Sequence, residues 1–273
     1  MRITGGTAVL VTGLAAIGGA AVYLVSTGHT GVRYSADHDG TVPLWFRWVP
    51  ALVGIALVRL VPFESVSPGE PPRRWRAQLA VLTAAAVAYA LVLPLADGDA
   101  GYLVVKLALL AVVPAVLLRR VRWSPARPTG RRWVPLVPVL GWLLVAYATP
   151  LAPPADDPGP AAAAALLAAL VLGFGVNAVL EELFYRRWLQ TRWEFAVGPW
   201  PAIVLSSLLW AVWHVAIQGT GDLPVDLASA VVNQGVLGLF LGYLWSRYRL
   251  VWPLLVVHGA VNSVPILLGV LLR

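Results

Sequence analysis

Long apolar runs fill most of the chain, and short polar segments separate them. Nine runs stand out, at residues 6–26, 43–63, 77–95, 101–118, 133–152, 161–184, 199–217, 226–245 and 251–271. A helix of 18 or more apolar residues can cross roughly 30 Å of hydrocarbon. Lipid offers no hydrogen-bond partners to an open backbone, so we expect each run to be helical. The pattern predicts an all-α fold, a polytopic transmembrane helical bundle of about 8–9 spans.

The composition also indicates a membrane protein. The 273 residues are 59% hydrophobic and only 12% charged, whereas a soluble domain carries roughly 25% charged residues. The chain has no cysteine, which excludes a disulfide framework and a thiol nucleophile. The net charge of +7 lies in short loops between apolar runs. We therefore expect the lipid bilayer as a partner and no nucleic acid.

The loops alternate in charge along the chain. Basic loops follow every second run and contain Arg73, Arg74, Arg76, Arg119, Arg120, Arg122, Arg127, Arg131, Arg132, Arg186, Arg187, Arg192, Arg247 and Arg249. The loops between them are acidic or neutral on balance, with Asp37, Asp39, Asp97, Asp99, Asp156, Asp157 and Asp222. Basic loops face the cytoplasm, so nine spans predict a cytoplasmic N-terminus and a C-terminus outside.

Two further expectations concern localisation. The first run is interpreted as a retained span, because Arg2 is its only preceding charge and its apolar stretch is long for a signal peptide. The abundance of arginine and alanine beside a single lysine is typical of a GC-rich bacterium. We therefore expect an integral protein of a bacterial plasma membrane.

Ionisable residues inside apolar runs are costly, so they are candidates for function. In the first half, Lys106 lies deepest, and it either snorkels to the interface or has a buried partner. The second half carries three groups of such residues, which are Glu181, Glu182 and Arg186, then Trp210 and His214, then His258 and Asn262. A lone polar residue of this kind more often makes an interhelical hydrogen bond, but several in compatible positions point to a site.

The spacing predicts that these groups meet within the membrane. At 1.5 Å per residue, Glu181 lies roughly 25 Å and His214 about 22 Å from a hairpin turn at Gly198. These depths agree with that of His258 if residues 186–194 form a polar tip that projects beyond the membrane. Glu182 and Arg186 are i,i+4 neighbours and should pair, whereas Glu181 has no basic residue at i±4.

This set of side chains can hydrolyse a peptide bond. Glu181 and His214 can orient and deprotonate a water, while His258 and Asn262 can donate hydrogen bonds to a developing oxyanion. Alternatively, Glu181, His214 and His258 form a zinc ligand set with an open water position. The cofactor is therefore left open. We favour the metal-free interpretation, because an asparagine beside His258 suits an oxyanion role.

Three motifs in the second half resemble the CPBP family, also called the ABI or CAAX-protease family, of membrane endopeptidases. The family motif EExxxR is matched by Glu181, Glu182 and Arg186, and HxxxN is matched by His258 and Asn262. The motif FxxxH reads Trp210-Ala-Val-Trp-His214, with tryptophan in place of phenylalanine. The resemblance covers about residues 160–270. We accordingly divide the chain into helices of unassigned role at 1–155 and a catalytic helical core at 156–273.

The resemblance implies an intramembrane endopeptidase, of either the glutamic or the metallo type. It implies a water-accessible cavity that opens toward the cytoplasm and a membrane-associated, CAAX-like protein or peptide substrate. Glu181 and His214 would activate water, and His258 and Asn262 would stabilise the oxyanion. Glu182, Arg186 and Trp210 would support them.

Two alternatives belong to other functional classes. A catalytically silent bacteriocin-immunity or scaffold protein could keep the fold, although it would have no chemical need for all four catalytic candidates. A small-solute transporter could use the polar groups as a binding site. Transporters often repeat such features in both halves, whereas here the polar groups gather in one half.

Overall fold

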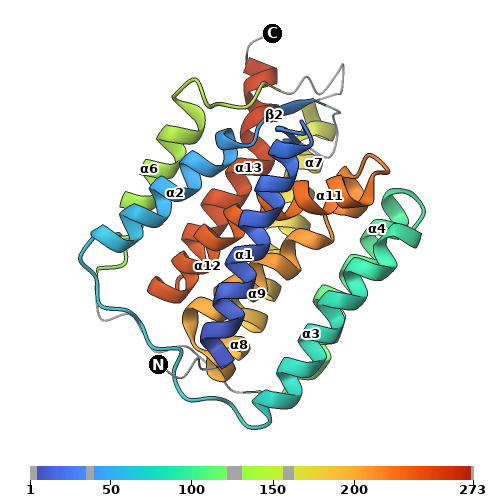
Figure 1. Ribbon diagram of the computed structural model, residues 1–273. Coiled ribbons are helices and arrows are strands. Elements are labelled where there is room, and N and C mark those ends of the chain that lie inside the picture. The colour runs from blue at the N-terminus through green and yellow to red at the C-terminus, as the bar shows by residue number, and fades with distance from the viewer. Residues whose placement is uncertain (1–4, 35–39, 122–130, 156–162, 272–273) are drawn as a thin grey trace.

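The protein is a bundle of helices with one short antiparallel ribbon (Figure 1). The computed structural model describes residues 5–34, 40–121, 131–155 and 163–271. Strands β1 (Gly31–Arg33) and β2 (Thr41–Pro43) pair with Val32 opposite Val42. All other regular structure in the described residues is helical, which confirms the predicted all-α class.

The N-terminal half of the bundle contains α1 (Gly5–Ser26), α2 (Trp45–Leu60), α3 (Trp75–Val92), η1 (Leu93–Leu95), α4 (Gly98–Lys106), η2 (Leu107–Val112), α5 (Val113–Leu118) and α6 (Leu136–Tyr147). The C-terminal half contains α7 (Ala163–Gly173), η3 (Phe174–Val179), η4 (Glu182–Gln190), α8 (Thr191–Val197), α9 (Pro199–Val212), α10 (Val215–Gln218), α11 (Leu223–Ala230), η5 (Val231–Gly235), α12 (Val236–Tyr248) and α13 (Trp252–Leu271). The segments η2, η3, η4 and η5 are π-helical turns within longer helices.

Seven helices in the described residues are long and apolar enough to cross a membrane. They are Gly5–Ser26, Trp75–Leu95, Gly98–Leu118, Leu166–Val197, Pro199–Gln218, Leu223–Tyr248 and Trp252–Leu271. The remaining two predicted spans correspond to α2, with 16 residues, and α6, with 12 residues. Both are shorter than the roughly 20 residues that a full crossing requires, and they pack against each other.

Residues 186–194, predicted to form a polar tip beyond the membrane, are helical and largely packed inside the protein. These residues continue the helix through η4 and α8 as far as Val197. Arg186, Arg192 and Glu194 are buried, and Arg192 donates from Nε to Gln78 Oε1 over 3.2 Å. Polar side chains of this segment therefore have partners inside the protein, and the position of the segment relative to the membrane stays a prediction.

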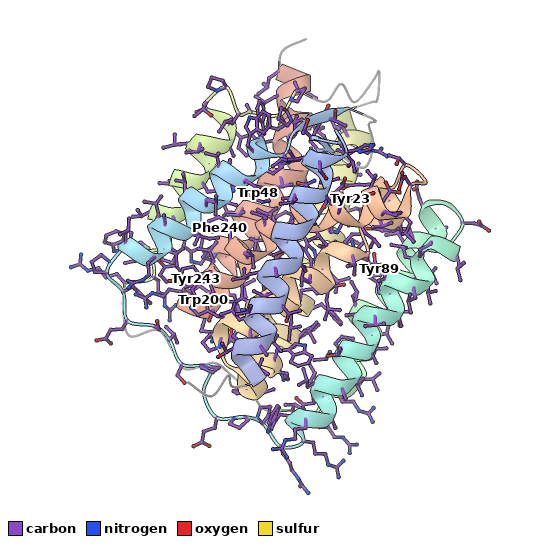
Figure 2. All side chains as sticks on the ribbon, in the orientation of Figure 1. Tyr23, Trp48, Tyr89, Trp200, Phe240 and Tyr243 are labelled. Carbon is purple, nitrogen blue, oxygen red and sulfur yellow. The ribbon has the colours of Figure 1, made fainter. Side chains whose placement is uncertain are left out.

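Close helix packing surrounds α9 and sets the positions of the site helices. A Cβ atom on Gly238 of α12 would lie 2.9 Å from Ser207 Cβ, and one on Gly13 of α1 would lie 2.1 Å from Val204 Cγ1. Only glycine allows these approaches. Aromatic side chains fill the interior, where the ring of Phe240 stacks on Trp142 at 6.4 Å between centroids (Figure 2).

Candidate active site

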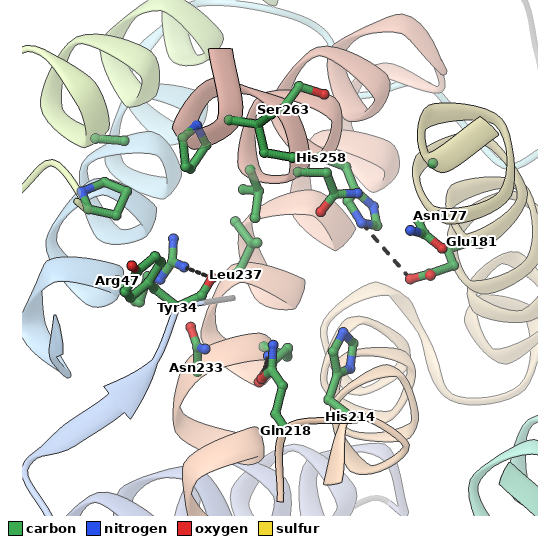
Figure 3. A pocket seen from close by; sticks show the side chains of 18 of the residues that line it. Tyr34, Arg47, Asn177, Glu181, His214, Gln218, Asn233, Leu237, His258 and Ser263 are labelled. Carbon is green, nitrogen blue, oxygen red and sulfur yellow. Dashed lines mark hydrogen bonds and ion pairs between the residues drawn. The ribbon is translucent and has the colours of Figure 1, made fainter. Parts of the chain in front are cut away.

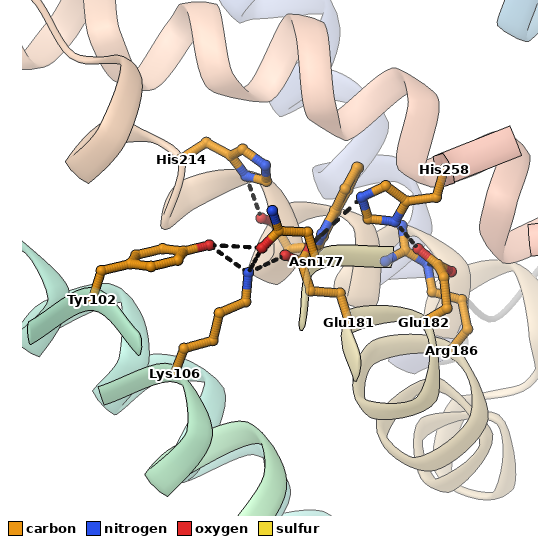
Figure 4. Close-up of polar contacts among 9 residues, drawn as sticks. Tyr102, Lys106, Asn177, Glu181, Glu182, Arg186, His214 and His258 are labelled. Carbon is orange, nitrogen blue, oxygen red and sulfur yellow. Dashed lines mark hydrogen bonds and ion pairs between the residues drawn. The ribbon is translucent and has the colours of Figure 1, made fainter. Parts of the chain in front are cut away.

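Glu181 lies at the centre of a buried polar cluster that joins four helices (Figure 4). It occupies the junction between the π-helical turns η3 and η4, and such turns in α-helices are frequent at functional sites. Its Oε2 accepts a 2.6 Å hydrogen bond from Trp210 Nε1, and its Oε1 forms a 2.5 Å ion pair with Lys106 Nζ. Both oxygens of the carboxylate are therefore held in place.

Lys106 reaches the cluster from α4, outside the region that carries the three motifs. Its side chain is fully buried, and Nζ also donates to Asn177 Oδ1 at 2.7 Å and to Tyr102 Oη at 2.5 Å. Of the two alternatives for Lys106, the structure thus supports the buried partner. Tyr102 was missed by the sequence analysis. The spacings of Tyr102 to Lys106 and of Asn177 to Glu181 are both i,i+4, so each pair shares a helix face.

Glu182 contacts two partners on its own side of the helix. Its Oε1 lies 2.7 Å from His258 Nδ1, and its Oε2 lies 3.4 Å from Arg186 Nε. The predicted pair of Glu182 with Arg186 is thus present, and the contact with His258 is an addition to it. Because a carboxylate accepts, His258 Nδ1 is the donor. The other ring nitrogen, His258 Nε2, faces Glu181 Oε2 at 4.0 Å.

His214 and Trp210 lie on one stripe of α9 and its C-terminal turn. His214 Nδ1 donates a 3.0 Å hydrogen bond to the carbonyl oxygen of Trp210, which fixes the ring orientation. The Trp210 ring lies edge-on to both His214 and His258, at 5.1 and 5.5 Å between centroids. The Arg186 guanidinium lies over the same ring at 4.4 Å. Trp210 therefore contacts both imidazoles, the Glu181 carboxylate and the Arg186 guanidinium.

A cavity of about 320 Å³ borders the cluster (Figure 3). Its walls include Glu181, His214, His258 and Asn262, so the four predicted catalytic residues share one space. Asn262 Nδ2 is buried and has no hydrogen-bond partner among the described residues. Asn233 and Gln234 also line the cavity, where they donate to Arg33 O at 2.8 Å and to Gln218 Oε1 at 2.5 Å.

The arrangement does not fit a zinc ion held by Glu181, His214 and His258. Both Glu181 oxygens already accept hydrogen bonds, and the Lys106 ammonium beside Oε1 would repel a dication. No group of three histidine or acidic residues in the described part of the chain is arranged to hold a metal.

Comparison with known proteins found one family. Residues 163–264 match the family model described as type II CAAX prenyl endopeptidase Rce1-like. The matched segment carries all three motifs and reaches from α7 to the middle of α13. Comparison with curated proteins found no match, and neither did comparison with solved structures.

Proposed function

We propose that the chain, which belongs through residues 163–264 to the CAAX-protease family, hydrolyses a peptide bond in a membrane-associated protein or peptide. One observation carries this proposal. A carboxylate, two imidazoles and an amide, contributed by three helices, face the same cavity inside a bundle of apolar helices. Hydrolysis within a membrane needs groups of this kind. A base must bind and deprotonate the water, and hydrogen-bond donors must stabilise the oxyanion that forms in apolar surroundings.

In the proposed reaction, Glu181 and His214 activate the water. His214 Nδ1 is committed as a donor to a carbonyl oxygen, so in the neutral ring Nε2 is a proton acceptor. Glu181 accepts a hydrogen bond from the water and orients it, while His214 Nε2 takes its other proton. The resulting hydroxide attacks the scissile carbonyl carbon. Lys106 and Trp210 hold Glu181 in position for this step.

His258 and Asn262 serve the opposite side of the carbonyl group. Asn262 Nδ2 is available to donate to the oxyanion. His258 donates from Nε2 when the ring carries both protons, and the carboxylates of Glu181 and Glu182 then balance its charge. When the tetrahedral intermediate collapses, the C–N bond breaks and His214 returns its proton to the leaving amine. Water is thereby divided between the new carboxyl group and the new amine.

The test is a comparison of membrane-protein termini in cells with the wild-type chain and with His214→Ala. We expect uncleaved substrates to accumulate in the variant and new N-termini to disappear. Glu194→Gln is the matched control, since Glu194 is a buried carboxylate that pairs with Arg249 and does not line the cavity. Identical termini in all three strains would favour the alternative of a silent immunity or scaffold protein.

A separate prediction concerns the metal. Because Lys106 occupies the position beside Glu181 that a cation would need, we expect the purified protein to carry far less than one zinc per chain. We also expect cleavage of a substrate found by the comparison above to survive a strong chelator. Stoichiometric zinc in elemental analysis, lost together with activity on chelation and restored on zinc addition, would contradict this prediction.

A further inference from the structure

The cavity extends from the middle of the bundle to one of its ends, called the open end below, and no residue of the opposite end lines it among the described residues. Its inner part is formed by the catalytic candidates, which lie just after α9, in the middle of α13 and in the middle of the long helix Leu166–Val197. Its outer part is lined by residues of the ribbon and of the turns at one end, which are Tyr34, Val42, Leu151, Pro153 and Gln218. Figure 3 shows Tyr34, Arg47 and Gln218 on the side of the cavity away from Glu181.

The opposite end of the bundle is closed by buried polar contacts. Glu194 forms an ion pair with Arg249, and Gln190 Nε2 donates to the carbonyl oxygen of Gly242 at 2.9 Å. Trp245 Nε1 donates to Thr191 Oγ1 at 3.0 Å. These side chains are buried and none of them lines the cavity. Access to Glu181 from this end would require the network to break.

The two ends differ in charge. The closed end carries the arginine-rich loops, with exposed Arg73, Arg74, Arg76, Arg119, Arg120, Arg131 and Arg132 against Glu64 and Glu70. The open end carries exposed Asp97, Asp99 and Asp222, with Arg33 and Arg47 partly buried beside Gln218 and Tyr34. Arginine-rich short loops stay in the cytoplasm. The charge distribution therefore places the closed end in the cytoplasm and the open end outside.

We infer that this protein takes its substrate from the extracytoplasmic side of the membrane. The inference deepens the proposed function and rests on it. The loop charges predict a cytoplasmic N-terminus and the family resemblance implies a cavity open to the cytoplasm, but the structure does not allow both. The N-terminus of α1 lies at the closed end and the ribbon that follows α1 lies at the open end (Figure 1). The loop charges decide in favour of the first expectation.

The cavity walls define the chemistry of the substrate. Leu166, Leu170 and Phe174 form an apolar wall, and Trp142 lies on another side. Polar groups at the outer part, including Asn233 and Gln234, can bind peptide backbone. The substrate is accordingly a peptide segment with apolar side chains, in an exported protein or in the outer leaflet. A prenylated C-terminus in the cytoplasm is on the wrong side of the membrane for this cavity.

The absence of cysteine allows a direct test with single introduced cysteines. Ser263→Cys reports on the cavity, Ala155→Cys on the exposed turn at the open end, and Ser67→Cys on the exposed loop at the closed end. A charged, membrane-impermeant methanethiosulfonate is added to intact spheroplasts and to inverted vesicles. We expect Ser263→Cys and Ala155→Cys to react in spheroplasts and Ser67→Cys to react only in inverted vesicles. Ile266→Cys, which also lines the cavity, replaces Ser263→Cys if that variant does not fold.

Reaction of the cavity cysteine only in inverted vesicles would overturn the inference, and so would its failure to react in spheroplasts where Ala155→Cys does. The labelling requires no catalysis, so it is independent of the proposed function. If the protein is a protease, reagent bound at Ser263→Cys in spheroplasts should also lower substrate cleavage at least tenfold. The two experiments can also give different answers. If the cysteines are labelled as expected but the His214→Ala strain has the same membrane-protein termini as the wild type, the proposed function is wrong and the inferred orientation of the cavity still holds.

Discussion

Glu181→Gln should lower kcat/KM for peptide hydrolysis by about 10²-fold or more, the usual contribution of a group that activates water. His214→Ala should have an effect of similar size. The double variant should be no worse than either single one, because the two residues act on the same water. The measurement is cleavage of an identified substrate by purified protein in proteoliposomes, normalised to the folded fraction. Retention of most activity by Glu181→Gln would remove Glu181 from the catalytic set.

Glu181→Gln should also lower stability, which the sequence did not suggest. From the absence of a basic residue at i±4, stability near that of the wild type was expected. The structure instead pairs Glu181 with Lys106, and both side chains are buried. Removing one charge of a buried pair costs about 3–5 kcal/mol, because the other charge stays buried without compensation.

The double variant Glu181→Gln, Lys106→Met separates stability from catalysis. It removes both charges, so we expect its thermal unfolding temperature to recover most of the loss seen in Glu181→Gln, while its activity stays low. Glu194→Gln is the matched control, because it breaks a buried ion pair with Arg249 at a distance from the cavity. It should lower the unfolding temperature and leave kcat/KM of the folded fraction unchanged. A double variant as unstable as Glu181→Gln would show that the ion pair does not govern stability here.

The sequence was sufficient to predict those structural features that depend on one local pattern of residues. Apolar run length predicted the seven long helices, and i,i+4 spacing predicted the pair of Glu182 with Arg186. Each of these features depends on residues within one helix or on the cost of exposing backbone to lipid.

The sequence was insufficient where partners come from distant helices. Lys106 and Glu181 are 75 positions apart, and no spacing rule connects α4 with η4. Glu182 meets His258 across 76 positions for the same reason. The contacts of the polar stretch 186–194 were not predictable, because its charges are visible in the sequence and their partners, such as Gln78 for Arg192, are not. The side of the membrane on which the cavity opens depends on which end of the bundle is closed by contacts between helices. These contacts join segments that are distant in the sequence, so only the folded structure reveals them.

Glu182→Gln should impair both stability and hydrolysis, since Glu182 joins Arg186 and His258. A neutral amide leaves the buried Arg186 guanidinium without its counter-charge, at a cost of about 3–5 kcal/mol. It also weakens the contact that fixes the orientation of the His258 ring. We expect the unfolding temperature to fall and kcat/KM of the folded fraction to drop by about tenfold or more, the usual effect of losing the partner that orients a functional histidine.

Arg186→Met distinguishes the two roles of Glu182, because it breaks the same ion pair and leaves the contact of Glu182 with His258 in place. Both variants should unfold at lower temperature than the wild type. Only Glu182→Gln should lose activity beyond its loss of folded protein, because it alone changes the carboxylate that fixes the His258 ring. Equal losses of activity in the folded fractions of the two variants would reduce Glu182 to a structural residue. Loss of activity by Glu182→Gln with no loss of stability, while Glu181→Gln stays active, would instead transfer the catalytic assignment from Glu181 to Glu182.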